Sequence, residues 1–347
     1  MTAFETASPT RPWTLDEFEE AVDGLAPVAV RAAATLRVAD HVAGGAVQLL
    51  PLAACVGAEP DLLRRLMRFL TCRGVFEEPE PDVYGLTDLS MTLLDGHPGR
   101  LRAWLDAGGI GSRMDRAVHG LLEAVRTGEP TYPRLYGRDF YADLADTGLG
   151  PDFDELRGDH AVTYAKDVAE ADLWADRSGV VDVGGGTGVL LEQVLLHHPH
   201  LHGALVDLPD AVTAAARRLV GSPVAKRFTP VPGSFFDPLP GGDAHVLVNV
   251  LHNWDDESAT RILRRCREAA APSGRVYVVE QPTDGADART ASAMDLRMFL
   301  FCGGRERSRA DFARLGAAAG LALVAEEPLP YGLRVLQLEP AGSGGAA

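Results

Sequence analysis

The chain has 347 residues, enough for one large or two ordinary domains with a hydrophobic core each. Hydrophobic residues at 46% and charged residues at 24% are typical of a globular protein. A formal net charge of −16 opposes binding to nucleic acid or to an anionic membrane surface, so we expect neither partner.

The four cysteines lie far apart and include no Cys-x-x-Cys pair, which predicts reduced and mostly buried thiols. The N-terminus lacks a basic region followed by an apolar core, and no apolar run approaches the length of a membrane span. These features predict a cytoplasmic protein without a membrane segment.

Residues 1–13 are predicted to be disordered, and residues 14–105 to form a winged-helix dimerisation domain. Thr14 and Glu17 make a capping-box pattern at the start of a first helix, and a second, apolar helix is expected over residues 27–41. Helices over 49–56 and 61–73 and short strands over 75–77 and 83–86 complete the winged unit. DNA binding is the alternative, but the wing is acidic, so dimerisation or a lid role is favoured.

Residues 106–176 are predicted to be a helical linker or lid that also forms the acceptor pocket. The segment is rich in aromatic residues, most of which we expect in the core. A minority, including Phe153 and Tyr164, are expected to line an apolar pocket for a small molecule.

Strands and helices alternate regularly over residues 177–340, which predicts an α/β fold with a Rossmann-like, seven-stranded, doubly wound sheet. The last two strands are separated by a short turn and predict a hairpin, with one antiparallel strand at the edge of the sheet. Residues 341–347 are expected to be a flexible tail. The strands are expected over 180–183, 203–208, 227–231, 244–251, 275–280, 321–326 and 333–338.

A glycine-rich loop joins the first of these strands to the next helix. It places Asp182, Gly184, Gly186 and Gly188 at alternate positions. A dinucleotide fingerprint would need glycine at Val189, and a phosphate loop would need a lysine. The pattern resembles instead the first motif of S-adenosylmethionine (SAM) dependent methyltransferases. The resemblance implies SAM as methyl donor and S-adenosylhomocysteine as product.

Ligands in an open α/β sheet lie at the carboxyl ends of the strands. Asp207 ends the second strand, where it is expected to bind the ribose hydroxyls, although it could instead cap the helix that starts at Pro209. Ser234 and Phe235 resemble the segment that holds adenine in small-molecule methyltransferases, with serine where aspartate is usual. Leu208 and Asn249 complete the expected cofactor site.

His252 follows the fourth strand, where it faces the expected ligand. Imidazole titrates near neutral pH and can accept a proton from a weakly acidic hydroxyl. A buried structural histidine is the alternative. The three acidic residues that follow, 255–257, are explained by capping and by the helix dipole.

From about residue 15 to residue 340 the chain resembles the SAM-dependent O-methyltransferases, which include plant caffeic acid and isoflavone enzymes and bacterial antibiotic-tailoring enzymes. The resemblance implies a homodimer, with His252 as general base and Glu280 and Glu306 as the acids beside it. For Glu306 an exposed salt bridge with Arg305 or Arg307 remains open. The matching motifs are residues 181–188, 207–209, 233–236, 251–254 and 303–308.

The expected acceptor is a small aromatic molecule with a phenolic or quinone-type hydroxyl. Asn253, Trp254, Met298 and Phe299 are expected to bind it together with the two aromatic residues of the helical region. A carboxylate or amine acceptor, diverted chemistry such as hydroxylation, and a regulator that only senses a metabolite remain alternatives. No metal is expected, because the four histidines within residues 197–202 span a helix end and a loop.

Overall fold

The computed structural model describes residues 14–284 and 288–341, so the predictions for residues 1–13 and for nearly all of the tail lie outside the described residues. The chain divides into two compact units, Met1–Asp115 and Arg116–Ala347. Within the described ranges, no helix is both long and apolar enough to cross a membrane.

The first unit is mainly helical and contains a two-stranded antiparallel wing. The capping box of Thr14 and Glu17 is confirmed. The single helix expected over residues 27–41 is wrong, because Arg37 adopts a left-handed conformation (φ 54°) and divides it in two. The elements are α1 (Leu15–Val22), α2 (Leu25–Thr35), α3 (Val38–Ala43), α4 (Leu49–Val56), α5 (Pro60–Thr71), β1 (Phe76–Glu80), β2 (Val83–Leu86), α6 (Asp88–Met91) and α7 (Leu101–Leu105), while α8 (Ile110–Val118) spans the unit boundary.

An apolar strip runs along α1 and α2 on the surface of this unit. Its members are more than half exposed, although their side chains are large and apolar. Exposed apolar surface of this kind marks an interaction site. The strip consists of Leu15, Phe18, Val22, Leu25 and Val28.

The second unit is built on a seven-stranded sheet with the order β5-β4-β3-β6-β7-β9-β8. The first five strands are parallel, and β9 is antiparallel to both of its neighbours. The strands are β3 (Gly179–Val183), β4 (His202–Asp207), β5 (Phe228–Pro232), β6 (Gly242–Val248), β7 (Ala270–Glu280), β8 (Leu321–Pro328) and β9 (Arg334–Pro340).

The predicted hairpin is confirmed, but the expectation of an antiparallel strand at the edge is wrong. The antiparallel strand β9 lies inside the sheet, between β7 and β8, and β8 forms the edge. The physical reason is the distribution of apolar side chains over the two faces of each strand. β9 contributes to the cores on both faces of the sheet, with Val335 on one face and Leu336 and Leu338 on the other. β8 packs its leucines on one face only, and its Val324 is 48% exposed, as an edge strand permits.

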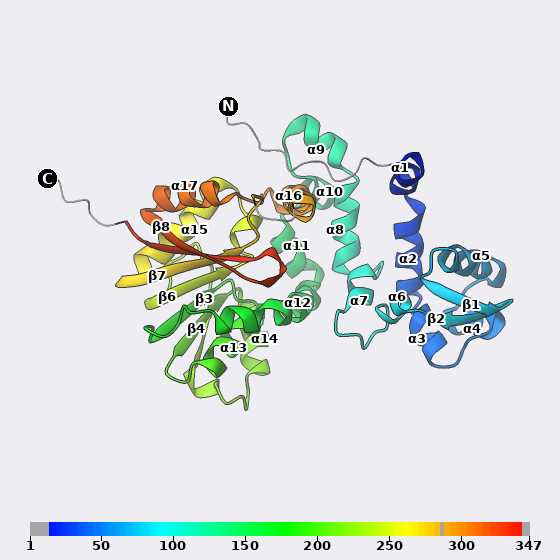
Figure 1. Ribbon diagram of the computed structural model, residues 1–347, viewed down its shortest axis with the longest axis horizontal. Coiled ribbons are helices and arrows are strands. Elements are labelled where there is room, and N and C mark those ends of the chain that lie inside the picture. The colour runs from blue at the N-terminus through cyan, green and yellow to red at the C-terminus, as the bar shows by residue number, and fades with distance from the viewer. Residues whose placement is uncertain (1–13, 285–287, 342–347) are drawn as a thin grey trace. The chain divides into compact units, whose positions relative to one another are not determined.

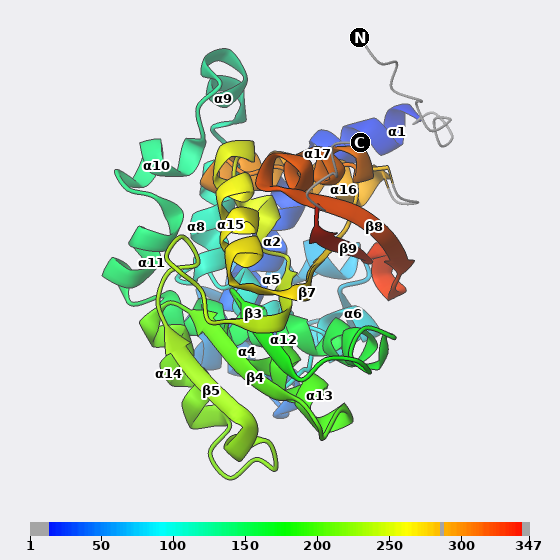
Figure 2. The same ribbon diagram turned by 90° about the vertical axis from the view of Figure 1, so that its left-hand side faces the viewer.

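Helices cover both faces of the sheet (Figures 1 and 2). On one face α12 (Gly150–Glu170), α13 (Val189–His197) and α14 (Pro209–Arg218) pack on alternate strand residues. On the other face α15 (Asp256–Ala269) and α17 (Arg309–Ala319) pack on the residues between them. The remaining helices are α9 (Leu121–Thr127), α10 (Thr131–Tyr136), α11 (Phe140–Thr147) and α16 (Ala288–Cys302), with short 3-10 turns at Ala225–Arg227, Leu251–Asn253 and Pro330–Gly332.

His245 is a titratable side chain inside the sheet, on β6. It is 0% exposed, its Nε2 lies 3.1 Å from the carbonyl oxygen of Pro240, and its Nδ1 has no hydrogen-bond partner among the described residues. Burial lowers the pKa of this imidazole below its usual range. The native state therefore holds His245 neutral at a pH where the unfolded chain is protonated.

We predict that His245 makes the fold sensitive to mild acid. Below about pH 6.5 the unfolded state binds a proton that the native state does not, so the free energy of unfolding falls as the pH falls, by up to about 1.4 kcal/mol per pH unit from this group. Urea unfolding of the wild type and of His245→Gln between about pH 7 and pH 5 tests this. The free energy of unfolding should fall more steeply with decreasing pH in the wild type than in His245→Gln. An equal pH dependence in the two proteins would contradict the prediction.

Candidate active site

The glycine loop follows β3 and leads into α13. Gly184, Gly186 and Gly188 have φ angles of 74°, 57° and 75°, a region that strongly favours glycine. Gly185 is required for a different reason: a Cβ at this position would overlap the Asp182 carboxylate and the side chain of Leu205. The loop therefore brings main-chain groups close to the end of β3.

Asp207 holds the glycine loop from the end of β4. Its carboxylate accepts hydrogen bonds from the N–H of Gly186 and the N–H of Leu208, both at 2.7 Å. The alternative of a helix cap is not observed, because α14 begins at Pro209 with Leu208 as its N-cap and no capping side chain. Leu208 itself is 48% exposed at this edge.

Asp182 is a buried carboxylate beneath the loop. It is 1% exposed, and its Oδ2 has no hydrogen-bond partner among the described residues. Burial, with a contribution from the charge of Asp207, raises the pKa of Asp182 to about 7. A cationic ligand would stabilise both carboxylates in their ionised form, and the sulfonium of SAM is such a cation.

A pocket opens between α12 and the glycine loop. Tyr164, which we expected in the acceptor wall, lines this pocket, and its hydroxyl is hydrogen-bonded to the side chain of Asn249. The lining also includes Arg157, a residue that the sequence analysis missed because it belongs to no motif. The lining residues are Arg157, Gly158, Ala161, Tyr164, Asp182, Gly184, Gly185, Gly186, Thr187, Val189, Leu190 and Val248.

The loop after β5 carries the residues expected at adenine. The Oγ of Ser234 accepts a hydrogen bond from the N–H of Phe236 at 3.2 Å, so this side chain stabilises its own turn. Phe235 lies close to Gly184, and its ring is edge-on to Trp254 with centroids 5.8 Å apart. The loop thus joins the cofactor side of the site to the segment that carries His252.

His252 lies in the 3-10 turn Leu251–Asn253 and is 8% exposed. Its Nδ1 is 2.9 Å from Oε1 of Glu306, which is 6% exposed. The alternative of an exposed salt bridge for Glu306 is therefore wrong, because its carboxylate is buried against the imidazole. Among the described residues, ligand-type atoms of His252, Glu280 and Glu306 all lie within 4.8 Å of one another.

Glu280 interacts with the main-chain N–H of His252 and not with its imidazole ring. Its Oε1 accepts hydrogen bonds from the N–H of Leu251 at 2.7 Å and the N–H of His252 at 3.1 Å. Burial raises the pKa of Glu280, and the neighbouring charges of His252 and Arg307 act in the opposite direction. Glu280 thus fixes the start of the turn that presents the imidazole.

Apart from Tyr164, the residues expected to bind the acceptor fall into two groups. Trp254 stacks on Tyr141 of α11, with centroids 6.1 Å apart and ring planes 12° from parallel, and Phe153 is edge-on to Phe140 at 5.3 Å. Together these rings form an aromatic wall that runs from the helical region to the histidine turn.

The other expected acceptor residues stabilise the loops around this wall. The Asn253 side chain donates to the carbonyl oxygens of Asn249 at 3.1 Å and Val250 at 3.2 Å. The main-chain carbonyls of Met298 and Phe299 accept hydrogen bonds from Gly304 and Gly303, at 3.2 and 2.9 Å. The Met298 side chain is 8% exposed, and that of Phe299 is partly buried.

The histidines near the end of α13 turn to separate partners. Ring nitrogens of His197, His198 and His200 lie 2.9, 2.8 and 3.2 Å from the carbonyl oxygens of Gln193, Ala169 and Trp174. The three rings therefore contact three different carbonyl oxygens and do not face a common point.

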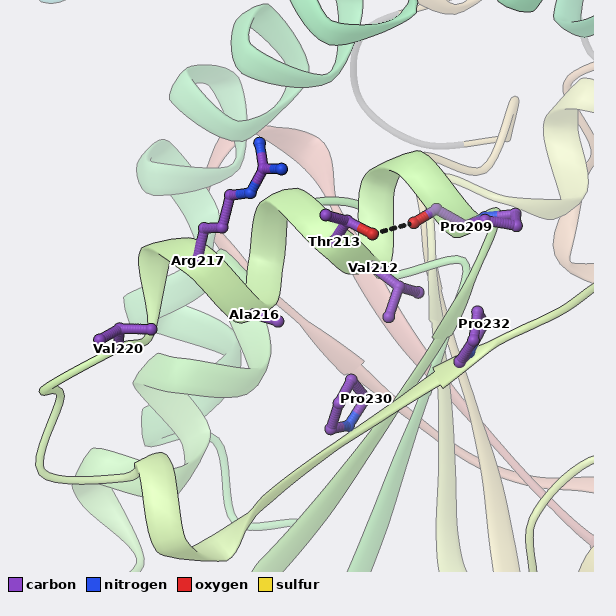
Figure 3. A pocket seen from close by; sticks show the side chains of 8 residues that line it. All are labelled: Pro209, Val212, Thr213, Ala216, Arg217, Val220, Pro230 and Pro232. Carbon is purple, nitrogen blue, oxygen red and sulfur yellow. Dashed lines mark hydrogen bonds between the residues drawn. The ribbon is translucent and has the colours of Figure 1, made fainter.

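A hollow of about 480 Å³ lies between α14 and the edge strand β5 (Figure 3). Its walls are apolar apart from Thr213 and Arg217, and it shares no residue with the pocket at the glycine loop. Pro230 and Pro232 lack an N–H group, which protects this edge from pairing with another strand. The hollow contains no group that could act as a base.

The fold and this site define the class of protein: the chain belongs to the O-methyltransferase family. Residues 118–322 match the O-methyltransferase domain, and residues 20–96 match the O-methyltransferase dimerisation domain. The 2,7-dihydroxy-5-methyl-1-naphthoate 7-O-methyltransferase of Streptomyces carzinostaticus is 44% identical over 307 residues, which cover 88% of this chain and 92% of that protein. Aclacinomycin 10-hydroxylase RdmB of Streptomyces purpurascens is 43% identical over 324 residues, 90% and 86% of the two chains.

A solved structure extends the similarity to three dimensions. The O-methyltransferase NcsB1 from neocarzinostatin biosynthesis, in complex with SAM and 2-hydroxy-5-methyl naphthoic acid, has a TM-score of 0.86 and 42% identity. The match covers 92% of this chain and 98% of NcsB1. The chain is thus a SAM-dependent O-methyltransferase of the type that tailors bacterial antibiotics.

We predict that Gly304→Ala lowers both the turnover and the stability of the enzyme. A Cβ at residue 304 would overlap the main chain of His252 and Asn253, so the turn must move. Displacement of a buried segment costs about 1–3 kcal/mol in stability, and a shift of about 1 Å in a group that takes part in catalysis lowers turnover by about 100-fold. Turnover and thermal unfolding should both change, whereas Gly96→Ala, with no heavy atom within 4 Å of its Cβ, should change neither.

Proposed function

We propose that this enzyme transfers the methyl group of SAM to the hydroxyl of a small aromatic acceptor, with His252 as the general base. The observation that carries this proposal is the buried contact of 2.9 Å between Nδ1 of His252 and Glu306. A carboxylate only accepts hydrogen bonds, so Nδ1 carries the proton and Nε2 remains free to accept one. The negative charge of Glu306 also stabilises the imidazolium that forms.

The cofactor is held, in this proposal, by groups at the carboxyl ends of the strands. SAM supplies the methyl group as an electrophilic sulfonium. Asp207 binds the ribose, Asp182 offers the Oδ2 atom for which the described residues provide no partner, and Arg157 provides a cation for the carboxylate of the methionyl group. Asn249 orients Tyr164 in the same pocket, while Leu208, Ser234 and Phe235 border the adenine.

The acceptor class follows from the aromatic wall and from the relatives. Trp254 and Tyr141 offer flat apolar surfaces, which favour a planar ring system. Both the 7-O-methyltransferase and NcsB1 are named with naphthoate-type ligands. Incubation with labelled SAM and a panel of phenols, naphthols and hydroxynaphthoates tests this: label should enter an ether that base does not hydrolyse, whereas an ester or an amine product would contradict O-methylation of a ring hydroxyl.

Hydroxylation is a second candidate, because RdmB, named as a hydroxylase, is nearly as similar as the 7-O-methyltransferase. Mass spectrometry of the product separates the two reactions. A methyl ether retains the methyl group of SAM, whereas a hydroxylated product gains oxygen and carries no label.

We predict that His252→Ala lowers kcat by about 100- to 10,000-fold, the usual contribution of general acid–base catalysis. Glu306→Gln should lower it less, because an amide holds the ring but does not stabilise its charge. The Kd of SAM, measured by calorimetry, should stay the same in both variants, which shows that the cofactor site is intact. Full turnover of His252→Ala across the pH range would contradict the role of the base.

We also predict that the enzyme is a homodimer that pairs through the apolar strip of α1 and α2. Leu25 and Val28 are 54% and 61% exposed, and charges at both positions would be buried unpaired in such an interface. Light scattering should give a dimer for the wild type and a monomer for the double variant Leu25→Asp/Val28→Asp. Val220→Asp, at a residue that is 80% exposed in the other unit, should remain dimeric. A dimeric double variant would rule out this interface.

A further inference from the structure

Arg307 is a charged residue whose side chain is 0% exposed. Burial of a guanidinium is unfavourable unless its N–H groups find acceptors. Here Nη1 donates to the carbonyl oxygen of Leu251 at 2.8 Å, Nη2 donates to that of Trp254 at 2.7 Å, and Nε donates to the Asp256 carboxylate at 3.0 Å. The group is thus satisfied mainly by main-chain atoms of one short turn.

That turn is the one that carries His252. Leu251 precedes the histidine directly, and Trp254 is the C-cap of the same 3-10 turn. The carbonyl oxygen of His252 itself accepts a hydrogen bond from the N–H of Arg305 at 2.9 Å. Three of the four carbonyls around the imidazole are therefore held by the segment that contains Arg307.

We propose that Arg307 is a positioning residue for His252, and that Asp256 orients its guanidinium. This inference rests on the proposed role of His252 as the base. The planar fork holds the carbonyls of Leu251 and Trp254 at the same time, which fixes the turn and keeps Nδ1 in line with Glu306. Arg307 does not contact the reacting atoms and acts only through the histidine.

The charge of Arg307 supports the same role. Glu280 and Glu306 place two carboxyl groups beside one imidazole in a buried site. Arg307 supplies the cation next to them and favours the ionised form of Glu280, which in turn accepts the N–H groups of Leu251 and His252. The turn is thus held from both sides, by Glu280 at its N–H groups and by Arg307 at its carbonyls.

Lysine would not replace this arginine fully. An ammonium is a compact charge on a flexible stem, and it lacks the rigid fork that reaches two carbonyls and a carboxylate together. Arg307→Lys should therefore keep the charge but loosen the turn. Arg307→Met, similar in size and uncharged, should leave the carbonyls of Leu251 and Trp254 without a donor.

The test compares Arg307→Lys and Arg307→Met with the matched control Arg309→Gln. Arg309 lies two residues away, is 52% exposed and pairs with Glu326 at 2.8 Å, outside the site. We expect kcat to fall about 10-fold in the lysine variant and about 100-fold in the methionine variant, the loss that a displacement of about 1 Å can cause. The Kd of SAM should change by less than about twofold, since the carbonyl contacts do not touch the cofactor pocket. The control should keep the wild-type kcat.

A spectroscopic signal separates positioning from a general structural role. In enzyme labelled with ¹⁵N-histidine, the Nδ1 proton shared with Glu306 should give a low-field resonance that is absent from His252→Gln. It should shift or broaden in both Arg307 variants and stay unchanged in Arg309→Gln. Wild-type kcat and an unmoved resonance in Arg307→Lys would overturn the proposal.

Asp256 gives a test that does not depend on the fold of the Arg307 variants. Its side chain is 48% exposed, so Asp256→Ala should fold, and it should lower kcat several-fold at unchanged Kd for SAM. Wild-type kcat in Asp256→Ala would overturn the orienting role. If His252→Ala itself keeps its turnover, the general-base proposal fails, whereas an inactive His252→Ala with a fully active Arg307→Lys refutes only the positioning role.

Discussion

The geometry of the candidate site depends on the hydrogen bond between His252 and Glu306, which joins two segments that the sequence separates by the whole of α15, β7 and α16. The bond forms only because the main chains of these segments meet, and they meet only because residue 304 has no side chain. One main-chain approach thus sets the tautomer and the direction of the imidazole. A surface ion pair between the same two residues would provide neither, because solvent would screen it and the side chains would remain free to move.

At the glycine loop, the cost of burying two carboxylates is set against the hydrogen bonds that they accept. Asp182 and Asp207 place two carboxylates near each other, and burial raises the pKa of both. The main-chain N–H groups of Gly186 and Leu208 offset this cost for Asp207, but the Oδ2 of Asp182 has no such compensation among the described residues. The described residues therefore leave the Asp182 carboxylate without full compensation, and a bound cation would stabilise its ionised form. This condition suits a sulfonium and disfavours a phosphate-bearing dinucleotide.

Much of this structure could be predicted from the sequence because it depends on local patterns. Strand and helix periodicity, the positive-φ glycines and the position of His252 at a strand end are local properties, and the structure agrees with them. The order of β8 and β9 is not local, because it depends on which strand is covered on both faces. The buried position of Arg307 was missed for a related reason: the sequence suggested it only as an exposed partner of Glu306, because arginine is usually exposed and nothing in its neighbours shows that distant carbonyls surround it. Tyr164 and Glu280 have the expected residue types, but their partners belong to elements that only the fold brings near.

Trp254 connects the loop after β5, the aromatic wall and the turn that carries His252. Its ring contacts Phe235 and Phe236 of the loop after β5 and Tyr141 of α11, and its carbonyl oxygen accepts a hydrogen bond from Arg307. An acceptor that stacks on this wall would contact a residue whose main chain is fixed two residues from His252. Because Trp254 and His252 share one short turn, the positions of the acceptor ring and of the imidazole would be set by the same hydrogen bonds. Methyl transfer requires the attacking oxygen, the methyl carbon and the sulfur to lie in line. When one set of hydrogen bonds positions both the acceptor ring and the imidazole, the two groups stay aligned with each other even if the turn shifts slightly.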